Sequence, residues 1–226
     1  MPRSSAQPLA QSKGFTLIEL LVAIAIMAVM AMLSWRGVDG MVRSLEQTRT
    51  RSVAVSRLSA GLSQWQADLE AVHESGQTPG MDFDGKTLRW VRRDADPQSA
   101  AVTVVAWTVR PDAGTTTGQW LRWQSKPLRT KGELDAAWLM AQQWSTNPVK
   151  AQQQQEVSIA RASDWQIFFY RTDAWVNPQS SGATSASNVV AMPDAVRLIL
   201  NLGQGAGVSG KLTKDWVRPI VGGGKS

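Results

Sequence analysis

The chain has no cysteine and a single histidine among its 226 residues. Without cysteine it can form neither disulfides nor thiolate metal sites, so its folded part must be held together by packing. One histidine also falls short of a zinc site. A Ser–His–carboxylate triad would have to use His73, which we expect at the end of a helix, where a solvated histidine suits the helix dipole. The sequence therefore predicts no catalytic residues, no metal and no cofactor, and the chain is not expected to be an enzyme.

Tyrosine is also scarce, with one residue against eleven tryptophans. The tryptophans are spread from Trp35 to Trp216 instead of being grouped in one segment. Because a large aromatic side chain usually serves to bury area, we expect most of them in the core of a sheet, with a ligand platform as the alternative. Any that are exposed would be contacts for neighbouring subunits.

Charge is almost missing from one segment near the N-terminus. Residues 1–14 are polar, and the 19 residues from Phe15 to Leu33 that follow carry one charge, Glu19. At 1.5 Å per residue this run spans roughly 28 Å, close to the roughly 30 Å of a bilayer core, which predicts a membrane helix. The alternative is a secretory signal cleaved after an A-x-A site such as Ala23 to Ala25. The length of the run and its internal carboxylate both oppose that reading.

Glu19 needs a partner if it lies within a membrane, since an unpaired carboxylate there costs several kcal/mol. Cleavage between Gly14 and Phe15 would supply one, because the new α-amino group of Phe15 is a cation at the same depth. When related helices stack with an axial stagger, the amine of one subunit can meet the carboxylate of its neighbour. Such a pair would hold the two subunits together and would also fix their axial register.

The segment Lys13–Val22, KGFTLIELLV, resembles the prepilin cleavage and methylation motif of type IV pilins and type II secretion pseudopilins. By that resemblance a membrane prepilin peptidase cuts after Gly14, Phe15 is N-methylated, and Glu19 is the motif glutamate that sets subunit register. Lys13 and Arg3 before the span predict a cytoplasmic leader. The chain would then be a single-pass protein of the inner membrane with its head in the periplasm.

No proline interrupts the chain between the membrane span and Pro79. Apolar residues follow alternating steps of three and four, which predicts one amphipathic helix continuing to about His73. Thr48 and Ser52 interrupt this seam, and Gly76, Pro79 and Gly80 end the pattern. The seam consists of Met41, Leu45, Thr48, Ser52, Val55, Leu58, Leu62, Trp65, Leu69 and Val72.

The remainder is typical of sheet, with short β-branched or Trp-rich runs bounded by turn clusters. One helix is expected within it, at Gly132 to Trp144. The fold class is therefore α+β and pilin-like, with a long N-terminal helix packed on an antiparallel β-sheet head. The expected strands are Thr87 to Arg93, Ala101 to Val109, Gln119 to Ser125, Glu156 to Ala160, Asp164 to Arg171, Asp194 to Leu200 and Leu212 to Pro219.

The predicted organisation has five parts. Residues 1–14 are a leader that is removed, residues 15–34 a transmembrane helix, and residues 35–75 a stalk helix continuing from it. Residues 76–220 form the β-rich periplasmic head, and residues 221–226 a flexible tail.

The head is larger than is usual for a major pilin. Trp35–Asp39 after the span, the Asp164–Arg171 strand with Trp175, and the Met192–Leu198 run are similar to the minor pseudopilin J class (PulJ/GspJ) of type II secretion. This resemblance implies a structural subunit that joins I-class and K-class minor pseudopilins and the G-class major one. It would help start pseudopilus assembly for export of folded proteins across the outer membrane. Glu19 opposes the K class. The alternative is a minor type IV pilin used in adhesion or DNA uptake.

Three other patterns have features of calcium, phosphate or nucleic-acid binding sites. Asp82-Phe83-Asp84-Gly85 has alternating carboxylates but lacks the later acid of a calcium loop, and we interpret it as a turn. The glycines of Gly203–Gly210 and Gly222–Gly224 lack a phosphate-loop lysine and predict a hairpin loop and the tail. Arginines near tryptophans could line a nucleic-acid groove, but a sheet with one wet face gives the same pattern, so no nucleic acid is expected. These arginines are Arg89, Arg92, Arg93, Arg110 and Arg122.

Overall fold

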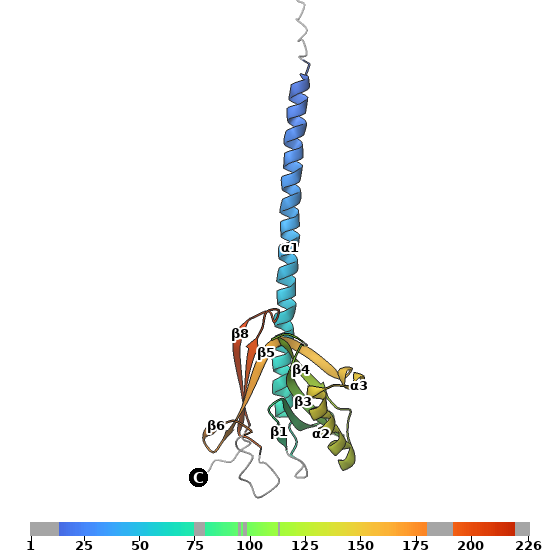
Figure 1. Ribbon diagram of the computed structural model, residues 1–226, viewed down its shortest axis with the longest axis vertical. Helices are drawn as coiled ribbons and strands as arrows, with labels where there is room; N and C mark the ends of the chain where they lie inside the picture. Colours follow the sequence, from blue (N-terminus) through green and yellow to red (C-terminus); the bar gives the residue numbers. More distant parts are fainter. Residues whose placement is uncertain are drawn as a thin grey trace, which may run out of the picture. The chain divides into compact units, whose positions relative to one another are not determined.

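The computed structural model describes residues 14–74, 80–94, 96, 99–112, 114–179 and 192–219. The predicted leader up to Lys13, the helix breakers Gly76 and Pro79, and the predicted tail lie outside the described residues. Contacts divide the chain into two units, with the boundary between Arg49 and Thr50. Helix α1, Leu17–Glu70, is continuous across that boundary (Figure 1).

The first unit contains the first part of α1. All its side chains from Leu17 to Arg49 are exposed, including a dense run of Leu, Ile, Val and Met. Among the described residues α1 is the one helix long and apolar enough to cross a membrane. An apolar surface of this extent is characteristic of a helix that lies in lipid or packs against other subunits.

The second unit is built on one antiparallel sheet with strand order β1-β2-β3-β4-β5-β7-β8, and β6 pairs with β5. Two helices lie between β4 and β5: α2, Lys131–Thr146, and α3, Lys150–Gln153. The strands are β1 Met81–Phe83, β2 Thr87–Arg93, β3 Val102–Pro111, β4 Gly118–Gln124, β5 Glu156–Arg171, β6 Ala174–Val176, β7 Ala195–Leu202 and β8 Gly210–Val217.

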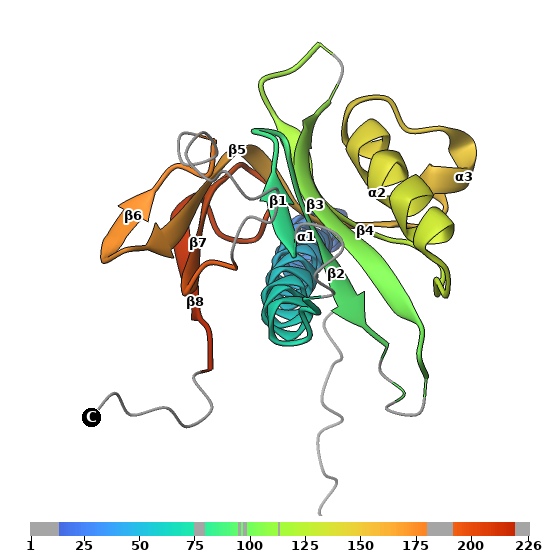
Figure 2. The ribbon, with the colours of Figure 1, turned by 90° about the horizontal axis from the view of Figure 1, so that it is seen from below.

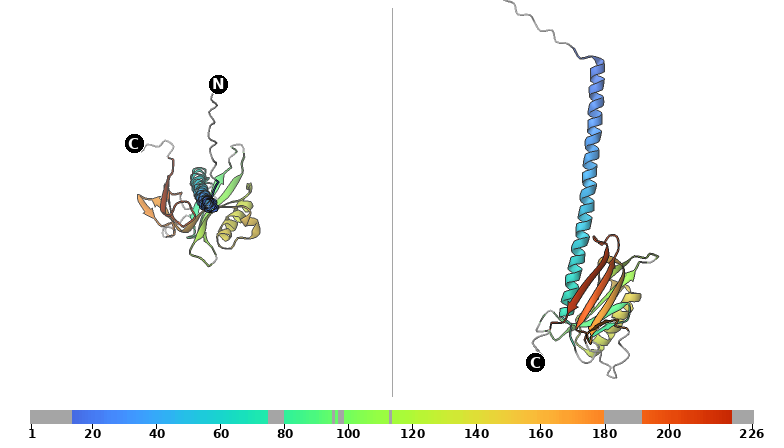
Figure 3. Two further views of the ribbon diagram at one scale, coloured as in Figure 1. Left: turned by 90° about the horizontal axis from the view of Figure 1, so that it is seen from above. Right: turned by 90° about the vertical axis from the view of Figure 1, so that its left-hand side faces the viewer.

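The sheet curls around the last turns of α1, and α2 covers the opposite face of β2 to β4 (Figure 2). Strands β5, β7 and β8, coloured orange to red, lie beside the same end of the helix (Figure 3). The long helix packed on a curled antiparallel sheet confirms the predicted α+β, pilin-like architecture.

Strand alternation creates two cores, one on each face of the sheet. Trp107 and Trp120 face α1 and surround Trp65 of that helix, with ring centroids 5.2 and 6.2 Å from it. Their neighbours Ala106 and Leu121 face α2 instead. This is the period-2 pattern that places successive side chains on opposite faces. The tryptophans therefore serve the core, as predicted.

The prediction that exposed tryptophans of the head contact neighbouring subunits stays a prediction, and the structure leaves few tryptophans to which it applies. Among the described residues of the second unit, Trp138 and Trp175 are partly exposed and the other tryptophans are buried. Burying each large ring against the helix or the opposite strand removes more apolar area from water than leaving it at the surface.

Two predicted segments take a different form. Glu156 to Ala160 and Asp164 to Arg171 are parts of the single 16-residue strand β5. Register shifts opposite Trp120/Leu121 and at Ala162/Asp164 let one strand pair first with β4 and then with β7. Bulges of this kind bend a strand without ending it, so the polar residues between the two runs do not form a turn.

The predicted turn Asp82–Gly85 is shorter than expected. Asp82 lies in β1 and holds Arg89 at 2.7 Å, so its carboxylate is engaged in an ion pair across the strands. Asp84 accepts hydrogen bonds from the backbone N–H groups of Lys86 and Thr87 at 2.9 and 2.7 Å. Gly85 has φ of 93°, which a glycine adopts without strain. The two acids thus build a hairpin and do not converge on a cation.

Asp68 joins α1 to the sheet through a fully buried carboxylate. Arg122 of β4 donates to both carboxylate oxygens, from Nε at 2.7 Å and Nη2 at 2.9 Å. Arg92 of β2 adds an ion pair at 3.1 Å, and Trp107 Nε1 of β3 donates at 3.2 Å. Each of three adjacent strands therefore contributes a donor to one carboxylate, which compensates for its removal from water.

The helix approaches the sheet closely at Gly61. A side-chain methyl at this position would overlap Ile159, which lies at the β5 bulge. Glycine here leaves room for the Ile159 side chain against α1, and a larger residue would force that side chain to move.

We predict that Asp68→Asn strongly destabilises the second unit. Asparagine cannot neutralise the two partly buried guanidinium groups of Arg92 and Arg122, and breaking a buried ion pair in this way costs about 3–5 kcal/mol. Chemical denaturation of the full chain in detergent, followed by tryptophan fluorescence, reports on this unit because nearly all the tryptophans lie in it.

The matched control is Glu74→Gln, which removes a half-exposed pair with Arg218 at 2.6 Å. That change should cost at most about 1 kcal/mol. A loss in Asp68→Asn no larger than in Glu74→Gln would show that Asp68 does not hold the helix to the sheet.

Candidate functional site: the start of helix α1

The first turn of α1 is closed by a reciprocal pair of residues, Thr16 and Glu19. The backbone N–H and the hydroxyl of Thr16 both donate to Glu19 Oε2 at 3.0 Å. In return the N–H of Glu19 lies 3.4 Å from Thr16 Oγ1. This is the capping box, in which a threonine before the helix and a glutamate three residues later satisfy free backbone donors of the first turn.

The motif glutamate therefore has a role within its own helix. The spacing Thr-x-x-Glu is the sequence signature of this cap, whereas the charge of Glu19 by itself predicts only a carboxylate that needs a partner outside its helix. Within the described residues its hydrogen bonds all fall on Oε2. The second oxygen, Oε1, is left to accept from another molecule.

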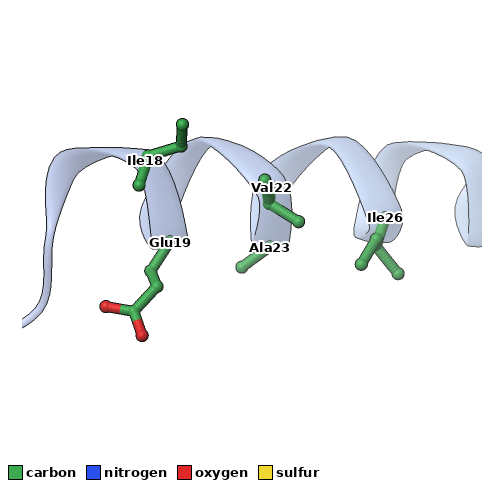
Figure 4. A pocket seen from close by; sticks show the side chains of 5 residues that line it. All are labelled: Ile18, Glu19, Val22, Ala23 and Ile26. Atoms are coloured by element: carbon green, nitrogen blue, oxygen red, sulfur yellow. The ribbon is translucent and has the colours of Figure 1, made fainter.

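The carboxylate is presented outward on the helix surface. Figure 4 shows it projecting away from the helix, beside the apolar side chains Ile18, Val22, Ala23 and Ile26. These residues line a shallow depression in which a side chain of a neighbouring helix could sit. This surface thus combines a carboxylate with an apolar recess.

Gly14 and Phe15 precede the helix without regular structure. Both are exposed, Phe15 to 88%, and apart from its chain neighbours no described residue lies within 4 Å of a Cβ placed at Gly14. A peptide bond in such a segment can enter a protease site without unfolding any helical turn.

Residues 9–35 match the family described as the prokaryotic N-terminal methylation motif. No curated protein matches the chain. The matched segment includes Gly14, Phe15, the capping box and the apolar start of α1. Together, the motif and the long apolar helix indicate a type IV pilin-like or pseudopilin protein. Such a motif implies processing by a prepilin peptidase and assembly with other pilins, and the helix is compatible with single-pass anchoring in the inner membrane.

His73 lies just past the end of α1, close to its expected place. Its backbone N–H donates to the carbonyl of Val91 at 2.8 Å, and its Nδ1 accepts from Arg93 Nε at 3.1 Å. The ring thus helps to attach the helix end to β2. Across the described ranges no three His, Asp or Glu side chains come close enough to hold a metal ion.

The arginines weighed for nucleic-acid binding are engaged within the second unit. Arg92 and Arg122 hold Asp68, Arg89 holds Asp82, and Arg110 pairs with Glu156 at 2.6 Å. These ion pairs are partly or wholly buried, and the tryptophans between them form the core. The pattern of arginine and tryptophan therefore comes from helix-to-sheet packing and does not form a basic groove lined with free aromatic rings.

A further aromatic group lies on the uncovered face of β5 to β8. Arg197 stacks over Trp175 at 4.2 Å from the ring centroid and pairs with Asp215 at 2.7 Å. Its guanidinium lowers the pKa of the Asp215 carboxyl by hydrogen bonding to it. The exposed ring is thus already covered by a cation from its own chain.

We predict that Thr16→Ala loosens the first turn of α1, whereas Glu19→Gln leaves it closed. Alanine removes the hydroxyl of the cap, at a cost of about 1 kcal/mol, or about fivefold in the opening equilibrium. Glutamine keeps an oxygen that can accept from the Thr16 N–H. Amide hydrogen exchange of the full chain in detergent measures both effects, with Ser34→Ala in the middle of the helix as control. Equal exchange at residues 18–20 in Thr16→Ala and the unchanged chain would contradict the cap.

Proposed function

We propose that the chain is a minor pseudopilin of a type II secretion system, a structural subunit and not an enzyme. In this role it forms part of the pseudopilus tip and helps start assembly of the filament that exports folded proteins across the outer membrane. The observation that carries the proposal is the methylation-motif match at residues 9–35 at the start of a 54-residue helix whose far end packs on an α+β head.

The proposed maturation follows from the residues at the start of α1. A prepilin peptidase removes residues 1–14 by cutting between Gly14 and Phe15, and the amine of Phe15 is then N-methylated. Residues 15–34 span the inner membrane, residues 35–75 continue as the stalk, and residues 76–220 form a periplasmic head. The basic residues Arg3 and Lys13 favour a cytoplasmic leader.

The proposed assembly contact joins the Phe15 amine of one subunit to the Glu19 carboxylate of the next. Thr16 remains after cleavage, so the capping box persists in the mature chain and keeps Glu19 Oε2 engaged. Oε1 then accepts from the neighbouring amine. In a low-dielectric membrane each charge offsets the desolvation cost of the other, which fixes the axial stagger between subunits.

The J class is the proposed position within the pseudopilus. The large head, the Trp35–Asp39 segment and the Asp164–Arg171 and Met192–Leu198 runs support this assignment. The partners would be I-class and K-class minor pseudopilins and the G-class major one. In this role the head supplies shape and contacts, and no reaction takes place on it.

We predict that Glu19→Gln separates maturation from assembly. The peptidase acts at Gly14–Phe15, so the variant should still lose its leader and gain the mass of one methyl group. Without the charge the Phe15 amine of the neighbour is unpaired, and recovery of pseudopilin complexes from membranes should fall at least tenfold. Intact mass spectrometry and co-purification measure the two effects. Ser34→Ala serves as control, and full assembly of Glu19→Gln would disprove the pairing.

We further predict that the full-length chain, co-expressed with I-class and K-class candidates, is recovered with both in one complex of fixed composition. Detergent extraction followed by size-exclusion chromatography with light scattering measures that composition. Recovery with neither would exclude the J class. Binding to DNA or to surfaces would then be measured instead, since a minor type IV pilin remains the alternative.

A further inference from the structure

A polar cleft of about 310 Å³ lies within the second unit, between α1, the paired strands β4 and β5, and the β7–β8 loop. Arg57 of α1 and Arg161 of β5 both line it, together with Gln119 of β4 and Ser158 of β5. Gly205 of the loop forms one wall. Nothing in the proposed maturation or in the contact at Glu19 uses this cleft.

The two arginines differ from those around Asp68. Arg92, Arg122, Arg89 and Arg110 each pair with a carboxylate of their own unit. Neither Arg57 nor Arg161 has a side-chain hydrogen bond or ion pair with any residue that the structure describes. Two full positive charges thus share one cleft without a counter-charge from the described chain.

The lining is held in place by its neighbours. Gln119 and Arg161 stand directly opposite each other in the β4–β5 register. Ser158 Oγ donates to Gln119 Oε1 at 2.9 Å, which occupies the amide oxygen and leaves the amide NH₂ group as a donor. The absence of a side chain at Gly205 makes room for Arg161, since a Cβ there would lie 3.2 Å from Arg161 Cδ.

The cleft therefore offers hydrogen-bond donors and positive charge. Two guanidinium forks and an amide NH₂ match the two oxygens of a carboxylate, which binds arginine in bidentate fashion. Ala54 and Arg57 of α1 line the cleft, and the residues of the second unit just before them, Thr50 to Val53, are exposed. A second subunit in contact with these exposed residues would bring its own side chains to the mouth of the cleft.

We propose that the cleft receives an Asp or Glu side chain of a neighbouring subunit in the filament, an inference that rests on the proposed function. The pair would lie in a partly enclosed site, where charge complementarity selects the partner and its orientation more than it adds affinity. Glu19 would set the stagger of subunits within the membrane. Arg57 and Arg161 would select, by their charge, the neighbouring subunit that binds to the second unit.

The test uses Arg57→Lys and Arg161→Lys in the full chain, in membranes that contain its pilin-like partners. Lysine keeps the positive charge and introduces an amine that a carbodiimide couples to a carboxylate only in direct contact. We expect a cross-link from each introduced amine to an acidic residue of another chain, mapped by mass spectrometry and absent without the substitution. Arg218→Lys is the matched control, because its partner Glu74 belongs to the same chain and the link should be intramolecular.

A charge exchange gives a second readout. Arg57→Glu should lower recovery of the complex several-fold, and replacing the mapped acid of the partner by arginine should restore it. If the complex co-purifies but neither introduced amine forms a link to another chain, the cleft proposal is wrong while the proposed function stands. If the chain co-purifies with no pilin-like subunit, both are wrong.

Discussion

The second unit depends on one buried carboxylate, Asp68, which is held by donors from three adjacent strands. Arg92 and Arg122 lie two residues after Trp90 and Trp120, so each Trp-x-Arg run places a ring and a cation on the same face of its strand. Trp107, between them on β3, donates to the same carboxylate. The acid fixes α1 in register with the sheet, because among the described residues it is the one carboxylate that pairs with these partly buried cations.

Packing of this kind involves the residues of α1 from Leu58 onward, whereas its side chains from Leu17 to Arg49 are all exposed. The apolar surface of that exposed stretch is characteristic of a helix covered by lipid or by other subunits. Two acids of the helix, Asp68 and Glu19, illustrate the difference. Asp68 is neutralised by arginines of its own chain, whereas the hydrogen bonds of Glu19 within the described residues fall on one oxygen. The pairing of Asp68 is thus explained within the second unit, and the second oxygen of Glu19 is open to another molecule.

Much of the fold was accessible from the sequence because its periodicities are strong. The predicted strand Thr87–Arg93 has the bounds of β2, and the predicted stalk helix ends within a few residues of Glu70. The predicted strand bounds were wrong where the deciding contact joins residues that are far apart in the sequence. Glu156 and Asp164 open two runs of one bulged strand, and Asp82 belongs to β1 because Arg89 pairs with it across the strands. The Thr16–Glu19 cap is local, and its Thr-x-x-Glu spacing is sufficient to predict it from the sequence.

By itself the sequence determined the apolar span, the methylation motif and the alternation of strands, because each of these depends on residues close together in the chain. Only the tertiary structure decided which charged side chains are paired and which are not. Asp68 meets arginines 24 and 54 positions away, whereas Arg57 and Arg161, 104 positions apart, share a cleft with no acid. No local pattern distinguishes a paired arginine from an unpaired one, since the distinction is made by the register of β4 and β5 and by the approach of α1 at Gly61.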